Sequence, residues 1–227
     1  MLDKRWSCKF LDLNPYSSTF GGGLAQKSIA NPGVASSKTQ LADISPAVAA
    51  DLSNVVLTLQ DLPPGFTEAS SLASLKNLFQ NSGFKPASLF AYQKIDSKLF
   101  ELQFLIGFTV QLSDPIQQAR FDQAIGERSF AKAVSQGLNR NKESQFAPPA
   151  ALTLQDKIGE VSAGWRSQGK IENIPMNVDL ALFRRGQIGV FMATLYLDGT
   201  KPTITISEAA RKFDSRMMEL KPDLTKQ

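Results

Sequence analysis

Apolar side chains occupy every second position from residue 100 to residue 112. Polar or small residues separate them, with the single apolar exception of Leu105. A period of two is typical of a β-strand, because an α-helix would scatter the same side chains around its axis. The pattern predicts a long strand of an antiparallel sheet, with one face on a core and the other open to water or a partner. The apolar face consists of Phe100, Leu102, Phe104, Ile106, Phe108, Val110 and Leu112.

Helical periodicity predicts two amphipathic helices, one on each side of this strand in the sequence. The first covers residues 72–79 and stops at Gly83, because glycine suits the left-handed end of a helix. The second covers residues 206–217, and Thr205 and Glu208 form a capping box at its start.

A further helical region is predicted between the long strand and residue 138. Ser113, Asp114 and Pro115 combine capping side chains with a proline suited to the first turn of a helix. Ile116 is expected to face inward, and Gly126 is expected to divide the region into two helices.

Strand periodicity dominates the remaining segments. Strands are predicted at 55–59, 86–94, 100–112, 160–166, 176–182 and 188–197. Glycine and polar residues predict turns at 167–170 and 184–187. The order of elements is βαββ, helices, βββ and α. It predicts an α+β fold with a single antiparallel sheet and helices packed on one face.

The N-terminal residues differ in character from the rest of the chain. Residues 1–51 lack periodic apolar patterning and are rich in small and polar residues. They predict a flexible arm, followed by a single α+β domain at 52–222 and a short tail at 223–227. Basic residues near the start and small-residue sites near Ala25 and Ala35 resemble parts of an export signal, but polar residues interrupt the apolar stretch. A degenerate signal region and an ordinary disordered arm are both open interpretations.

The residue content excludes several kinds of active site. The chain has no histidine and one cysteine, Cys8, so it cannot build a histidine-based triad or the usual zinc and iron sites. Ser-x-x-Lys pairs occur at 82–85 and 167–170, but both fall in predicted turns, which would not align the two side chains. Asp156 and Glu160 straddle a loop-to-strand junction, which favours surface acids over a glycosidase pair. The sequence therefore predicts no catalytic residue, no metal site and no cofactor.

The charge distribution argues against nucleic acid as a partner. The chain has 25 Lys and Arg against 21 Asp and Glu, and the net charge of +4 is not clustered. Proteins that bind nucleic acid need a one-sided basic field, which displaces counterions from the phosphates. No run of residues approaches the roughly 18 apolar residues that span a bilayer, so a membrane-spanning segment is not predicted.

Two places are candidates for binding a protein partner. The second face of the 100–112 strand should be open, with Leu105 as an apolar centre and Gln103 and Thr109 around it. Arg184 and Arg185 lie together at a predicted hairpin tip, where they could hold a carboxylate through charge-assisted hydrogen bonds. The alternatives are a solvated sheet face and a solvated turn.

Three segments carry a resemblance to known proteins. They are Asp61-Leu62-Pro63-Pro64-Gly65-Phe66, Ile158-Gly159-Glu160 and Phe183-Arg184-Arg185-Gly186-Gln187-Ile188. Together they resemble extracytoplasmic α+β domains of cyanobacterial type, and the order of elements over residues 52–220 is similar to the PsbP-like fold. The resemblance implies an exported, non-enzymatic module of the periplasm or thylakoid lumen that binds a partner or ligand. It carries over no functional residue.

Three functional hypotheses follow from these observations. The first is a non-catalytic extracytoplasmic accessory protein that docks on a protein partner. The second is a carrier of an apolar small molecule held between the helices and the sheet. The third is a cofactor-free hydrolase. A cytoplasmic location is the alternative to export, because a lone cysteine also suits a reducing compartment.

Overall fold

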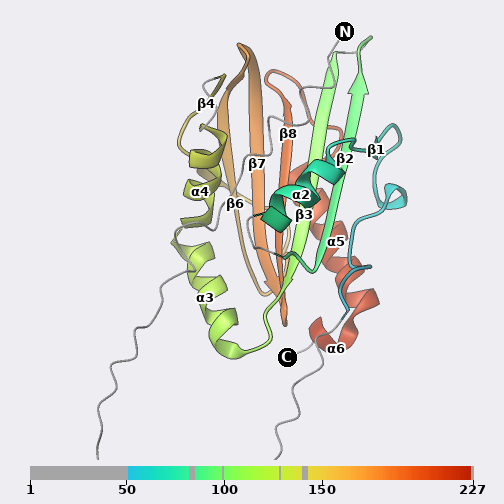
Figure 1. Cartoon of the computed structure of the whole chain (residues 1–227), viewed down its shortest axis with the longest axis vertical. Helices are drawn as coiled ribbons and strands as arrows, with labels where there is room; N and C mark the ends of the chain where they lie inside the picture. The colour runs from blue at the N-terminus through green and yellow to red at the C-terminus, as the bar shows by residue number, and fades with distance from the viewer. Residues whose placement is uncertain (1–50, 82–84, 99, 128, 140–142, 226–227) are drawn as a thin grey trace, which may run out of the picture.

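The computed structural model describes residues 51–81, 85–98, 100–127, 129–139 and 143–225. Apart from Asp51, the predicted N-terminal arm lies outside these residues. Figure 1 shows one antiparallel sheet with α-helices packed against it. The α+β class and the single antiparallel sheet predicted from the sequence are confirmed.

Eight strands form the sheet within the described residues, in the order β1-β2-β3-β8-β7-β6-β4, and β5 also pairs with β6. The strands are β1 (Thr67–Glu68), β2 (Ser88–Asp96), β3 (Glu101–Gln111), β4 (Ser144–Phe146), β5 (Ala150–Leu152), β6 (Val161–Ile171), β7 (Ile174–Arg185) and β8 (Ile188–Leu197). The helices are η1 (Leu59–Asp61), α2 (Leu72–Asn81), α3 (Pro115–Gly126), α4 (Ser129–Leu138), α5 (Ile206–Leu220) and α6 (Pro222–Thr225). The β2–β3 turn lies at one end of the sheet, the apical end, and the β7–β8 turn lies at the opposite, basal end.

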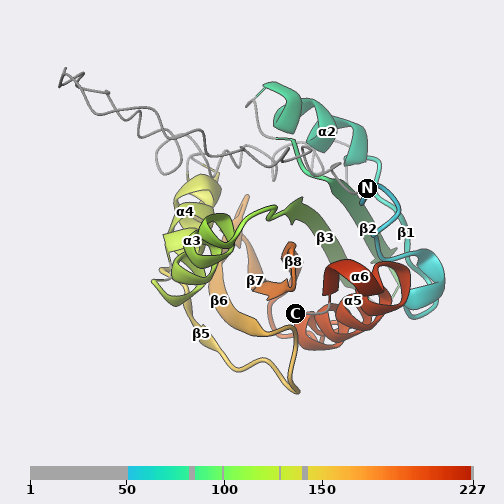
Figure 2. The same cartoon turned by 90° about the horizontal axis from the view of Figure 1, so that it is seen from below.

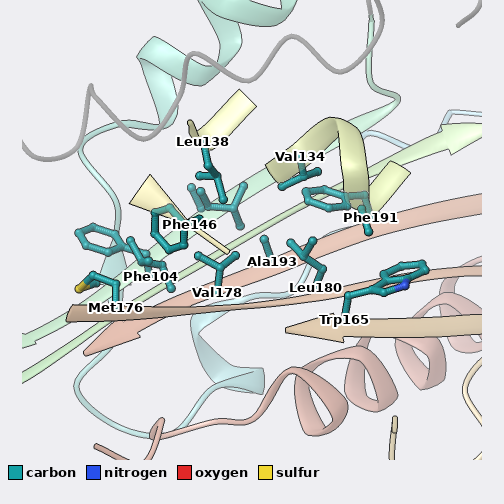
Figure 3. Close-up of a cluster of buried hydrophobic side chains, with 14 of the residues drawn as sticks. Phe104, Val134, Leu138, Phe146, Trp165, Met176, Val178, Leu180, Phe191 and Ala193 are labelled. Atoms are coloured by element: carbon teal, nitrogen blue, oxygen red, sulfur yellow. The ribbon is translucent and has the colours of Figure 1, made fainter. Parts of the chain in front are cut away.

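Apolar side chains fill both sides of the sheet. The first apolar cluster lies between the sheet and helices α2, α3 and α4, and includes Phe104, Trp165 and Phe191 (Figure 3). The second apolar cluster lies between the sheet and α5, together with residues 52–66. Figure 2 shows α3 and α4 on one side of the sheet and α5 on the other. The prediction of helices on one face only is wrong, because the chain after β8 returns along the second face as α5.

The second face of β3 is buried. Leu105 and Thr109 are completely buried, and Gln103 is almost so, beneath residues 52–66 and α5. A polar side chain can be buried when the protein supplies its hydrogen bonds. Thr109 shares a 2.7 Å hydrogen bond with Ser88, and Gln103 bonds to the backbone ahead of α5. The prediction that this face is open is therefore wrong, because its polar residues face internal partners instead of water.

The start of the domain crosses the second face instead of extending the sheet. The strand predicted at 55–59 is not formed, although Val55 and Leu57 are completely buried. Their carbonyl oxygens accept hydrogen bonds from side-chain hydroxyls, at 2.6 Å from Ser88 and 2.5 Å from Tyr92. These hydroxyls satisfy backbone groups that a neighbouring strand would otherwise satisfy.

The predicted starts of α3 and α5 and the predicted break at Gly126 are confirmed. Asp114 caps α3 by accepting a 2.8 Å hydrogen bond from the backbone N–H of Gln117, and α3 ends at Gly126 before α4 begins. Thr205 and Glu208 form the capping box of α5. The hydrogen bonds from the backbone and hydroxyl of Thr205 lower the pKa of the Glu208 carboxyl.

The turn predicted at 167–170 is wrong, because β6 continues through it. Glu172 and Asn173 make the turn into β7, and both have the positive φ angles of a tight hairpin. Gly169 serves a different purpose in β6. A Cβ atom there would lie 2.3 Å from the carbonyl oxygen of Gln145, so glycine allows β4 to approach closely.

Candidate functional site

A row of polar side chains crosses the second face of the sheet near its apical end. We call it the polar row; it consists of Gln103 on β3, Thr194 and Tyr196 on β8, Asn177 and Asp179 on β7, and Arg166 on β6. All of these residues except Arg166 are buried. Burial of so many polar groups requires internal hydrogen bonds. Alternation along the strands did not single out these residues as a group.

Asp179 is the charged centre of the polar row. Its carboxylate accepts two hydrogen bonds from the Arg166 guanidinium, at 2.6 and 2.7 Å, and one from the Tyr196 hydroxyl at 3.2 Å. The hydrogen bonds to Asp179 raise the pKa of Arg166, and burial raises the pKa of Tyr196 to about 12. Asp179 is therefore neutralised by a permanent cation, and Tyr196 stays protonated at neutral pH. Tyr196 is therefore not available as a general base at neutral pH.

Gln103 connects the polar row to the chain ahead of α5. Its amide nitrogen donates to the Thr194 hydroxyl at 2.9 Å and to the Ile204 carbonyl at 2.7 Å. Its amide oxygen accepts from the Ile204 N–H at 3.3 Å. Asn177 donates to Asp198 at 2.9 Å. The polar row thus fixes the segment between β8 and α5 against the sheet. The role of Gln103 in these contacts is structural.

The raised pKa of Tyr196 predicts a loss of stability at alkaline pH. Its hydroxyl titrates near 10 in an unfolded chain and at about 12 in the folded protein. The stability it contributes is therefore complete below about pH 10 and is lost as the pH rises toward 12. We expect about 2 kcal/mol of the free energy of unfolding to disappear over this range. Urea unfolding at several pH values should show a shallower alkaline decline for Tyr196→Phe, and parallel profiles would contradict the assignment.

Arg184 and Arg185 are neighbours at the basal end of β7, so their side chains leave opposite faces of the sheet. Arg184 donates to Asp122 of α3 at 2.8 and 2.9 Å and to Glu160 at 2.6 Å. Arg185 donates through Nε to Asp214 of α5 at 2.8 Å, and a second hydrogen bond joins its Nη2 to the same carboxylate. One arginine therefore holds α3 and the other holds α5.

These two arginines were the predicted residues for binding a partner's carboxylate. They do hold carboxylates, and all three of the carboxylates belong to this chain. The hydrogen bonds to Asp122 and Asp214 raise the pKa values of Arg184 and Arg185 respectively. Arg184 is buried and both arginines belong to β7, so the pair is not part of a freely solvated turn.

The end of the β2–β3 hairpin, which we call the hairpin tip, exposes two apolar side chains among the described residues, Ile95 at the end of β2 and Phe100 just before β3. Phe100 is 79% exposed and Ile95 is 47% exposed. Phe100 also has a φ of 51°, in the left-handed region that L-residues other than glycine, asparagine and aspartate seldom enter. The sequence placed Phe100 on the core face. That is wrong, because β3 begins at Glu101 and Phe100 belongs to the turn.

Polar contacts fix the base of the hairpin tip. Lys94 pairs with Glu101 across the hairpin at 2.7 Å and donates to the Thr203 hydroxyl at 3.0 Å. Asp96 accepts a 2.9 Å hydrogen bond from the backbone N–H of Lys98. Two positive and two negative residues therefore surround the tip, and their charges cancel.

The described part of the chain contains no group of three or more acidic or cysteine side chains placed to hold a metal ion. Within the same residues, no helix is both long enough and apolar enough to cross a membrane. Comparisons of the chain with family models, with curated proteins and with solved structures gave no match.

Proposed function

We propose that the protein is a non-catalytic accessory protein that docks on a protein partner through the hairpin tip. The observation that carries the proposal is Phe100, which is highly exposed in a left-handed backbone conformation. That conformation costs an L-residue roughly 1–2 kcal/mol, which glycine at the same position would avoid. A strained and exposed aromatic side chain does little for the free domain, so it points to a role in binding.

The hairpin tip suits an apolar pocket on a protein better than a charged surface. Phe100 supplies the kind of aromatic ring that anchors protein interfaces, and Ile95 adds apolar surface opposite Leu102. The charges around the tip cancel, and Lys94 and Glu101 already pair with each other. An anionic membrane or a nucleic acid would require a basic excess, which the tip lacks. The fixed base of the hairpin also reduces the ordering cost of binding.

A location outside the cytoplasm and a PsbP-like order of elements belong to the same proposal. Their support is the resemblance of residues 61–66, 158–160 and 183–188 to extracytoplasmic domains. Mass spectrometry of the mature protein from its native host tests export. Cleavage between residues 24 and 50 supports export, and an intact N-terminus favours the cytoplasm.

Replacing Phe100 with asparagine is expected to separate stability from binding. Asparagine enters the left-handed region more readily, so the free energy of unfolding should stay unchanged or rise by up to about 1 kcal/mol. Binding to the partner should weaken by at least about 30-fold, the usual consequence of losing an aromatic anchor. Urea unfolding measures the first effect, and titration calorimetry with the purified partner measures the second.

The partner can be identified with photoreactive benzoylphenylalanine in place of Phe100. The same probe in place of Ile116, which is 65% exposed near the basal end, is the matched control. The proposal is supported by a protein that crosslinks to the probe at position 100 but not to the probe at position 116, and that binds the Phe100→Asn variant more weakly. Equal crosslinking from both positions, or an unchanged affinity, contradicts it. An apolar molecule that co-purifies in native mass spectrometry would favour the carrier hypothesis instead.

A further inference from the structure

The Arg184 guanidinium binds one carboxylate, that of Asp122, at two points, and its third nitrogen is held by other groups. Its Nη1 atom donates to Glu160 at 2.6 Å and to the Gly186 carbonyl at 3.0 Å, which fixes the orientation of the guanidinium. Its Nε and Nη2 atoms form a fork that binds both oxygens of Asp122, at 2.8 and 2.9 Å. This two-point geometry is how arginine recognises carboxylates in general. The contacts through Nη1 would keep the fork in place if Asp122 moved away.

Helix α3, which carries Asp122, is attached by little apolar surface. Ile125 is its one buried residue, and Ile116 is 65% exposed, contrary to the prediction that it faces inward. Phe121 is partly buried against the first apolar cluster. Helix α5, in contrast, buries seven residues, including Phe213. A helix that buries so little opens at a lower free energy than the core helices.

We propose that Asp122 is a displaceable internal occupant of the Arg184 fork, and that a carboxylate ligand binds there when α3 moves away. The remaining charges suit this exchange. Glu160, from the segment before β6, stays paired with Arg184, and Arg185 stays paired with Asp214 of α5. A ligand carboxylate would replace one negative charge with another. The site lies at the basal end, so it does not depend on the docking role of the hairpin tip.

Chemical rescue of Asp122→Ala is the first test. The variant should melt at a lower temperature, and acetate should fill the vacated fork. At about 100 mM, sodium acetate should raise the melting temperature of the variant by roughly 2–4 °C over sodium chloride of equal ionic strength. The wild type should show no such difference, because Asp122 occupies the fork. Glu127→Ala is the matched control; it removes an acid just after α3 that bonds to Gln123, and acetate should not affect it.

Hydrogen exchange of the wild type tests the proposal even if Asp122→Ala folds poorly. The amides of α3 should exchange at least about tenfold faster than those of α5. Acetate should make the α3 amides exchange still faster, because it binds the Arg184 fork when α3 has moved away. Acetyl-Gly-Asp-Gly-amide serves as a second probe. Faster exchange of the α3 amides with both probes indicates that an acidic side chain of a protein can enter the Arg184 fork. Faster exchange with acetate alone indicates that the ligand is a small organic acid. Equal protection of α3 and α5, or no response to either probe, overturns the proposal.

Discussion

Replacing Phe104 with alanine is expected to lower the free energy of unfolding by roughly 3–5 kcal/mol. Phe104 lies in the middle of β3, is 9% exposed and belongs to the first apolar cluster. Figure 3 shows it among other core side chains that include Met176 and Val178. Removal of the ring forfeits its burial and leaves a cavity between the sheet and the helices that cover it, which cannot collapse freely because the surrounding core is closely packed. Urea unfolding followed by the fluorescence of buried Trp165 measures the change.

Phe100→Ala is the matched control for this prediction. This substitution removes the same atoms from the same hairpin, but the Phe100 ring is largely in water. The free energy of unfolding should therefore change by no more than about 0.5 kcal/mol. A loss below about 1 kcal/mol for Phe104→Ala would show that the ring is not part of a tightly packed core. Equal losses for the two variants would contradict the assignment of Phe100 to the turn.

The alternation along β3 predicts the strand and its core face, but not what covers the second face. Gln103 and Thr109 look like solvent-facing residues because they are polar. Their partners, Ile204 and Ser88, lie 101 and 21 residues away in the chain. A polar side chain in a strand shows only that a hydrogen bond is needed. Water and a distant backbone group supply that bond equally well, and local periodicity does not distinguish them.

The central ion pair of the polar row could have been predicted from a correctly placed turn. A two-residue turn at Glu172 and Asn173 sets the register of β6 against β7, and this register places Arg166 opposite Asp179. Gly169 suggested an earlier turn, which would end β6 too soon. The ion pairs of Arg184 and Arg185 could not be predicted in this way, because they depend on how α3 and α5 pack on the sheet. No local pattern in the sequence records that packing.

Replacing Arg166 with alanine is expected to lower the free energy of unfolding by roughly 3–5 kcal/mol. This is more than the 41% exposure of the Arg166 side chain would suggest. The reason is Asp179, which is 2% exposed and would lose both guanidinium hydrogen bonds. The Tyr196 hydroxyl, at 3.2 Å, is a neutral donor and cannot balance the charge. A buried carboxylate without a cation is far less stable than a surface charge without a partner.

Arg211→Ala distinguishes this effect from the loss of an exposed ion pair. Arg211 lies 3.6 Å from Asp156, both side chains are mostly exposed, and the loss of unfolding free energy should stay below about 1 kcal/mol.

A double variant, Arg166→Leu with Asp179→Leu, removes the buried charge and its cation together. Its stability should return to within about 1–2 kcal/mol of the wild type, because apolar residues of similar volume can replace a buried ion pair. If the double variant is as unstable as Arg166→Ala, packing of the two side chains matters more than neutralisation. In that case the polar row does not stabilise the sheet through charge.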